Sequence, residues 1–200
     1  MNRTVSKTGA AIVTVAVFCF ALCLIFRFPF GYYFVCMFLP LGYIMTAAGL
    51  QQESAPDRRA AANAGLVLSG VYAVLILLVY YAQATTVRLE ELSDQAGRLL
   101  DFRRGGLIFN YDLLGYGMMA LSTFFLGLSM RAERRADKWL KGLMTAHGLF
   151  FPGCFLLPMT GMFSRMAEGD GGGGTAALLC WCAYFLPVGI LAFLHFKREQ

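Results

Sequence analysis

Residues 65–82 read GLVLSGVYAVLILLVYYA, and the chain stays uncharged on both sides of them, from Ala60 to Val87. A helix that crosses the hydrocarbon core of a bilayer needs roughly 20 mainly apolar residues. This stretch is therefore predicted to be a membrane-spanning helix, and five further uncharged runs of similar length occur along the chain.

The composition supports a polytopic membrane protein. Of the 200 residues, 58% are hydrophobic and only 14% are charged, whereas soluble domains carry about 25% charged residues. We predict an all-α fold, a six-transmembrane-helix bundle that forms one domain over residues 1–200. The predicted spans are residues 8–26, 29–50, 62–84, 112–130, 140–163 and 175–196. Prolines 40, 152, 158 and 187 are expected to kink the second, fifth and sixth spans.

The charged residues predict the orientation. With six spans, the termini and the loops 51–63 and 131–141 share one side, which holds eleven basic and five acidic residues. The other side holds six basic and seven acidic residues. Because cytoplasmic loops are enriched in Lys and Arg, both termini are expected in the cytoplasm. No water-facing basic domain exists for nucleic acid, so membrane lipid is the expected partner of these charges.

The segment 84–111, between spans three and four, is the one outer loop expected to have structure of its own. Its apolar residues recur at three- and four-residue intervals and its charged residues fill the opposite arc, the pattern of an amphipathic helix. The apolar positions are Leu89, Leu92, Ala96, Leu99 and Phe102. Such a helix either lies on the membrane surface or covers a pocket between the spans.

Polar residues gather at one level beneath this loop. A polar group inside a span must find a partner, because lipid supplies none. The candidate ligand-binding residues are Arg27, Tyr80, Tyr81, Gln83, Asp112 and Tyr116, with His147 added from span five. Asp112 could pair with Arg27 or Arg165. The alternative is an interfacial belt of tyrosines with one structural ion pair.

Cofactor and metal sites are not expected. His147 has no second histidine or acid at its own level, and His195 lies at a different depth. The six cysteines fall inside spans, where they are expected to act as packing residues. No catalytic motif has the required spacing, so an enzyme is not the favoured interpretation.

Small residues form a stripe on span three at Ala61, Gly65, Ser69 and Ala73. Such a pattern lets two helices approach closely. It predicts packing inside the bundle or, alternatively, an interface with a second copy or with a partner membrane protein.

Several short motifs resemble an uncharacterised family of six-helix bacterial integral membrane proteins, a domain of unknown function. They are Phe28–Gly31, Tyr80–Gln83, Asp112–Gly117, Leu121–Phe125, Arg135 with Trp139-Leu140, and His147–Pro152. The resemblance implies the six-helix topology and a place in the bacterial inner membrane, and it draws attention to Asp112, Tyr116 and Gln83. It implies no activity or cofactor. That family more often has asparagine at the position of His147, which weakens a role specific to histidine.

Two functions remain open from the sequence. The first is the binding or transport of a small lipophilic molecule in an outward-facing pocket under the 84–111 loop. The alternative is an accessory or structural membrane protein that acts through helix contacts with a partner or with itself.

Overall fold

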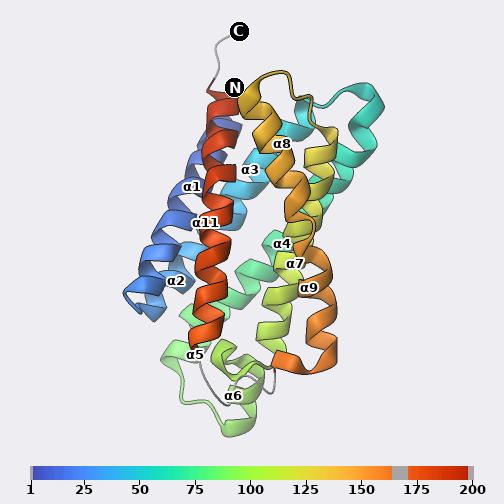
Figure 1. The fold of residues 1–200 in the computed structure, drawn as a ribbon. Coiled ribbons are helices and arrows are strands. Elements are labelled where there is room, and N and C mark those ends of the chain that lie inside the picture. Colours follow the sequence, from blue (N-terminus) through green and yellow to red (C-terminus); the bar gives the residue numbers. More distant parts are fainter. Residues whose placement is uncertain (1, 164–170, 198–200) are drawn as a thin grey trace.

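A computed structural model describes residues 2–163 and 171–197, and every regular element within these two ranges is helical (Figure 1). Six segments are long and apolar enough to cross a membrane, as predicted. In order they are α1 (Asn2–Ile25); α2 (Pro29–Cys36) with α3 (Phe38–Gln52); η1 (Pro56–Arg58), α4 (Arg59–Ala84) and α5 (Thr86–Leu89); α7 (Leu107–Ser129); α8 (Arg135–His147) with α9 (Phe150–Leu156) and η3 (Leu157–Thr160); and α11 (Gly171–Phe196). We call these six segments the spans.

The two ends of the bundle differ in what they carry. The start of α1 and the end of α11 lie at one end, which we call the termini end (Figure 1). The segment 84–111 lies at the opposite end, the loop end (Figure 1). Six antiparallel crossings produce this arrangement, in agreement with the prediction that both termini share a side.

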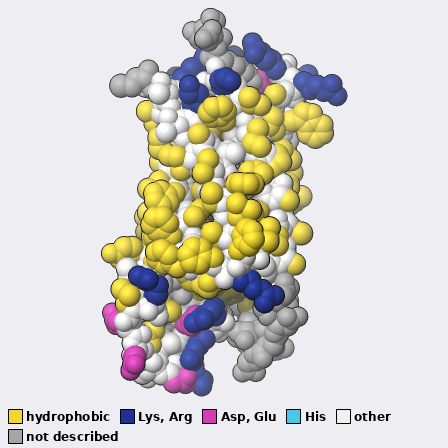
Figure 2. Space-filling model, turned by 90° about the vertical axis from the view of Figure 1, so that its left-hand side faces the viewer, with side chains coloured by type: hydrophobic (Ala, Val, Ile, Leu, Met, Phe, Trp, Pro, Cys, Tyr) yellow, Lys and Arg dark blue, Asp and Glu magenta, His cyan; other side chains and the backbone are white. Residues whose placement is uncertain are grey.

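The surface between the two ends is apolar. Figure 2 shows a belt of hydrophobic side chains with Lys and Arg gathered beyond it at both ends. Large apolar residues such as Phe18, Val67, Val74 and Leu78 are exposed along this belt. In water such a surface would drive aggregation, so the exposed belt fits a protein whose solvent is lipid.

The small-residue stripe packs inside the bundle. Gly65, Ser69 and Ala73 are buried, and a Cβ atom on Gly65 would lie 2.6 Å from the Leu126 side chain of α7. The Ser122 hydroxyl also donates a hydrogen bond of 2.6 Å to the Gly65 carbonyl. Helix α7 therefore packs on the Gly65 part of this stripe within the chain, which fits the predicted packing inside the bundle.

Two spans are broken, and proline explains both breaks. Pro40 has no N–H to donate to the carbonyl four residues before it, that of Cys36, and α2 ends there. Pro152 likewise has no N–H to donate to the carbonyl of Gly148, and Gly148 lies in the break between α8 and α9. Pro158 lies in η3, and α11 continues through Pro187. Interrupted helices are places where transporter folds build binding sites.

The 84–111 segment folds as several short pieces in place of the single amphipathic helix expected. The pieces are α5, α6 (Asp94–Leu100) and η2 (Phe102–Arg104). Glu90 ends α5 in an extended conformation, so Leu89 and Leu99 belong to different helices. Leu89 is 68% exposed and Leu99 47% exposed, and neither packs on the bundle as a continuous apolar face would.

Candidate functional site

Asp112 lies on the inward face of α7. Helix α7 begins five residues before it, at Leu107, so Asp112 sits more than one turn inside the helix and not at its opening. Tyr116, Met119 and Thr123 follow it at three- and four-residue intervals, and all are buried. Asp112 itself is only 3% exposed. The helix phase therefore points a carboxyl group into the core of the bundle.

Hydroxyl and thiol groups surround this carboxyl. The Tyr80 hydroxyl of α4 is in hydrogen-bonding contact with Asp112, and it lies 3.4 Å from the Tyr116 hydroxyl. Cys36, the last residue of α2, is in hydrogen-bonding contact with both tyrosines. We call Cys36, Tyr72, Tyr80, Asp112 and Tyr116 the Asp112 cluster. Three spans thus bring their polar groups to one place.

Two atoms of this cluster are buried without a partner. They are Oδ1 of Asp112 and the hydroxyl oxygen of Tyr72. The Tyr72 ring packs against the Tyr116 ring, with centroids 6.0 Å apart. Buried polar atoms are nearly always hydrogen-bonded in folded proteins, so two unpartnered ones in one cluster mark it as a candidate binding site.

An aromatic layer separates the cluster from the loop end. The Tyr33 ring contacts the Tyr80 ring at 6.0 Å and the Phe102 ring at 6.3 Å. Phe102 also contacts Phe109, with centroids 5.1 Å apart. The loop therefore covers the cluster through packed rings.

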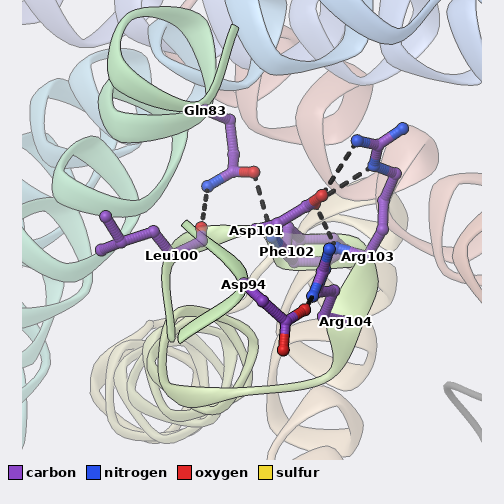
Figure 3. A network of polar contacts seen from close by, with 7 residues as sticks. All are labelled: Gln83, Asp94, Leu100, Asp101, Phe102, Arg103 and Arg104. Carbon is purple, nitrogen blue, oxygen red and sulfur yellow. Dashed lines mark hydrogen bonds and ion pairs between the residues drawn. The ribbon is translucent and has the colours of Figure 1, made fainter. Parts of the chain in front are cut away.

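Gln83 fastens the loop to the end of α4. Its side-chain N–H donates to the Leu100 carbonyl at 2.7 Å, and its oxygen accepts from the Phe102 N–H at 3.0 Å (Figure 3). The side chain is buried, and both ends of its amide are satisfied by backbone groups. Gln83 was expected to line a pocket, whereas its amide is fully engaged in holding the loop.

Ion pairs stiffen the loop itself. Arg104 contacts Asp94 at 2.6 Å, and Arg103 contacts Asp101 at 2.9 Å (Figure 3). The hydrogen bond from Arg104 and the charge of Arg98 lower the pKa of Asp94. Burial opposes ionisation of Asp101, but the hydrogen bonds from Arg103 outweigh it and keep the pKa of Asp101 below its usual range.

Arg27 and Tyr81 do not join the cluster. Arg27 is exposed after the end of α1, in the left-handed conformation at φ 52°, and no ion pair links it to Asp112 in the described parts of the chain. The other suggested partner, Arg165, lies outside the described residues. Tyr81 is 63% exposed because it lies one residue, about 100° of helix rotation, from the buried Tyr80.

Tyr81 instead borders an open groove on the lipid-facing surface. This lateral groove has a volume of about 340 Å³ and is lined by Met37, Val74, Leu77, Leu78 and Tyr81. It lies beside the break between α2 and α3, because Met37 joins these two helices. The groove is on the exposed side of α4, whereas Tyr72 and Tyr80 of the Asp112 cluster are on its buried side.

His147 is a hydrogen-bonded core residue. The Trp181 indole N–H donates to its Nε2 at 3.1 Å, so Nε2 accepts and the proton of the neutral ring is on Nδ1. That N–H faces the Thr123 hydroxyl at 2.8 Å, and Thr123 can in turn donate to the Ala120 carbonyl at 2.8 Å. Both ring nitrogens are occupied by the bundle, which leaves His147 without a free atom for a ligand.

A second polar cluster at the termini end was not anticipated from the sequence. His195 of α11 contacts Asp137 of α8 through Nδ1 at 2.9 Å and Glu53, just after α3, through Nε2 at 2.9 Å. Arg3 of α1 donates to Glu53 at 3.2 Å. We call this group the His195 clamp. The hydrogen bond from His195, opposed by partial burial, lowers the pKa of Glu53.

The clamp requires both imidazole nitrogens to donate, because each faces a carboxylate. A doubly protonated, positively charged ring meets this need. Asp137 was counted as a loop residue from the sequence, but it lies in the first turn of α8 and is 2% exposed. The clamp joins four spans at one point.

The described part of the chain contains no group of three or more His, Cys, Asp or Glu side chains arranged to hold a metal ion. All six cysteines are free thiols.

Comparison with protein-family models, with curated proteins and with solved structures found no match for this chain. The resemblance to the six-helix bacterial family therefore stays a prediction, and the functional argument rests on the Asp112 cluster itself.

Proposed function

We propose that this multi-pass membrane protein binds or transports a small lipophilic molecule at the Asp112 cluster. The observation that carries the proposal is the buried carboxyl group of Asp112, one oxygen of which has no partner. Ionisable residues inside membrane bundles are costly, and they commonly mark substrate or ion pathways.

The geometry suggests which parts of the chain serve the site. Tyr80 and Tyr116 supply hydroxyl groups beside the carboxyl, and the aromatic layer with the 84–111 loop covers it on the loop end. In this proposal Gln83 holds the cover, while Arg27, Tyr81 and His147 do not touch the ligand.

The orientation belongs to the same proposal. With the basic termini end in the cytoplasm of a bacterial cell, the loop and the Asp112 cluster lie toward the outer face of the inner membrane. A C-terminal fusion to a reporter that is active only in the cytoplasm tests this. Activity supports the orientation, and inactivity of an expressed, membrane-inserted fusion contradicts it.

The alternative, an accessory protein acting through helix contacts, loses its main support. The small-residue stripe that suggested an interface is covered by α7 within the chain.

Mass spectrometry of the protein purified in mild detergent tests the binding function. Wild-type protein should retain a small lipophilic compound that Asp112→Asn loses at least several-fold. Tyr116→Phe should weaken retention, whereas the matched control Tyr111→Phe changes an exposed ring one and a half turns away and should not. Equal retention by wild type and Asp112→Asn would exclude the Asp112 cluster as the binding site.

A further inference from the structure

Among the residues that the structure describes, the Asp112 carboxyl has neutral polar neighbours and no cationic partner. The Tyr80 hydroxyl is in hydrogen-bonding contact with it, and the other titratable groups that face it are Tyr72, Tyr116, Cys36 and, from α9, Cys154. In the ranges that the structure describes, no Lys, Arg or His pairs with it. A lone carboxylate in such an apolar place is strongly unfavourable, so the neutral acid is the form that suits these surroundings.

The surroundings favour a cation as soon as the acid ionises. The Tyr116 ring packs edge-on against Trp181 at 5.2 Å and against Tyr72 at 6.0 Å, and Tyr80 packs against Tyr33 at 6.0 Å. Aromatic faces attract cations, and the attraction grows when water is excluded. A carboxylate beside several tyrosine rings is therefore a good environment for one positive charge.

We propose that Asp112 is a proton–cation exchange site, which binds a lipophilic organic cation and releases one proton for each cation bound. This inference rests on the proposed function and specifies its ligand class. In the exchange the O–H bond of the acid breaks, its electron pair stays on the Asp112 oxygen, and the proton leaves to water. The carboxylate then balances the charge of the bound cation. The net charge of the site is therefore the same before and after the exchange.

The single carboxyl group and the rings around it define the charge and the chemical class of the ligand. One carboxylate balances one positive charge, so a singly charged ligand is expected. An inorganic ion would need several well-placed carboxylate or carbonyl oxygens, whereas this cluster offers one carboxyl group beside phenol hydroxyls and the Cys36 thiol. The aromatic rings around the carboxyl also favour a ligand with a hydrocarbon surface.

Binding of tetraphenylphosphonium to the full chain in detergent tests the exchange. Its affinity should rise by up to tenfold per pH unit across the titration range of the acid, and a pH indicator in weak buffer should report about one proton released per cation bound. Asp112→Asn should bind at least about tenfold more weakly, with neither pH dependence nor proton release. Circular dichroism verifies that the variant is folded.

Glu91→Gln is the matched control. Glu91 is an exposed acid at the same loop end. Glu91→Gln therefore removes an acidic group from the surface, whereas Asp112→Asn removes one from the core. It should leave affinity and proton release unchanged. If Glu91→Gln abolishes binding as fully as Asp112→Asn does, the cation is held by surface charge and the exchange is overturned.

An uncharged analogue separates this inference from the proposed function. Triphenylphosphine oxide has similar bulk without the charge. If it binds in a manner that depends on Tyr116 while tetraphenylphosphonium does not bind, the lipophilic site stands and the exchange falls. Cation binding without proton release also overturns the exchange. If neither compound binds wild-type protein, the exchange is rejected for these ligands and the retained-compound experiment decides the site alone.

Discussion

Two carboxyl groups are buried near opposite ends of the helical bundle, Asp137 toward the termini end and Asp112 toward the loop end. Their exposed fractions are nearly equal, 2% and 3%, but their partners differ. Asp137 faces the His195 imidazole at 2.9 Å, whereas Asp112 has, within the described ranges, only neutral neighbours and one oxygen without a partner. The same burial thus accompanies two different electrostatic environments.

The difference separates a structural acid from a candidate functional one. A buried charge that is paired and hydrogen-bonded holds its neighbours in place. A buried acid without a cation stabilises nothing by charge, so its presence needs another explanation. Binding is the explanation that the aromatic surroundings of Asp112 support.

Breaking the His195 clamp should have the largest effect on stability. His195→Ala leaves Asp137 buried without its imidazole partner, and removing one member of a buried pair costs about 3 kcal/mol or more. Unfolding in mixed detergent should show this loss. Lys197→Ala, an exposed change one residue past α11, is the control and should change stability by less than about 0.5 kcal/mol. A His195→Ala protein as stable as that control would show that the clamp does not stabilise the bundle.

Releasing the loop should have an intermediate effect. Gln83→Leu removes both hydrogen bonds to the loop and leaves the Leu100 carbonyl and the Phe102 N–H unpaired, at about 1–3 kcal/mol. Because the loss is local, hydrogen exchange should quicken over residues 94–104 and stay unchanged in α1. The control is Gln95→Leu, an exposed loop position. If hydrogen exchange in Gln83→Leu is no faster over residues 94–104 than in wild type, this side chain does not hold the loop in place.

Acidification should have the smallest effect, and Glu53 of the clamp is one group through which it acts. The pKa of Glu53 is lowered in the folded protein, so folding favours its ionised form. Its stabilising contribution is complete above the ordinary value of 4.5 and is lost as the pH falls from there through the lowered pKa. Glu53→Gln should flatten that part of the stability–pH curve. An identical curve for wild type and Glu53→Gln would show that this carboxylate is not the group responsible.

The six spans and the inward position of Asp112 could be predicted from the sequence. Long uncharged runs identify spans because lipid tolerates few charges. Asp112 and Tyr116, four residues apart, had to share one helix face. Both predictions depend on short-range spacing, which the helix geometry fixes.

The remaining parts of the site depend on contacts that spacing does not contain. Tyr80 and Tyr81 were both expected in the pocket, because a span surrounded by lipid is apolar on all faces and its hydropathy does not reveal which face is buried. Gln83 was placed at the correct level, but its partners are loop backbone atoms. The His195 clamp joins residues that are 58 and 142 positions apart, which the sequence shows only as scattered charges on one side.

The most direct test of the account is to measure the unfolding free energies of Asp112→Asn and Asp137→Asn side by side in the same detergent at pH 7. Asp137→Asn should lose about 2 kcal/mol, because it weakens a charge-assisted hydrogen bond. Asp112→Asn should be as stable as wild type or about 1 kcal/mol more stable, because the amide removes a carboxyl group that is costly to bury. A loss in Asp112→Asn equal to that in Asp137→Asn would contradict the account, since Asp112 would then be a structural residue like its counterpart.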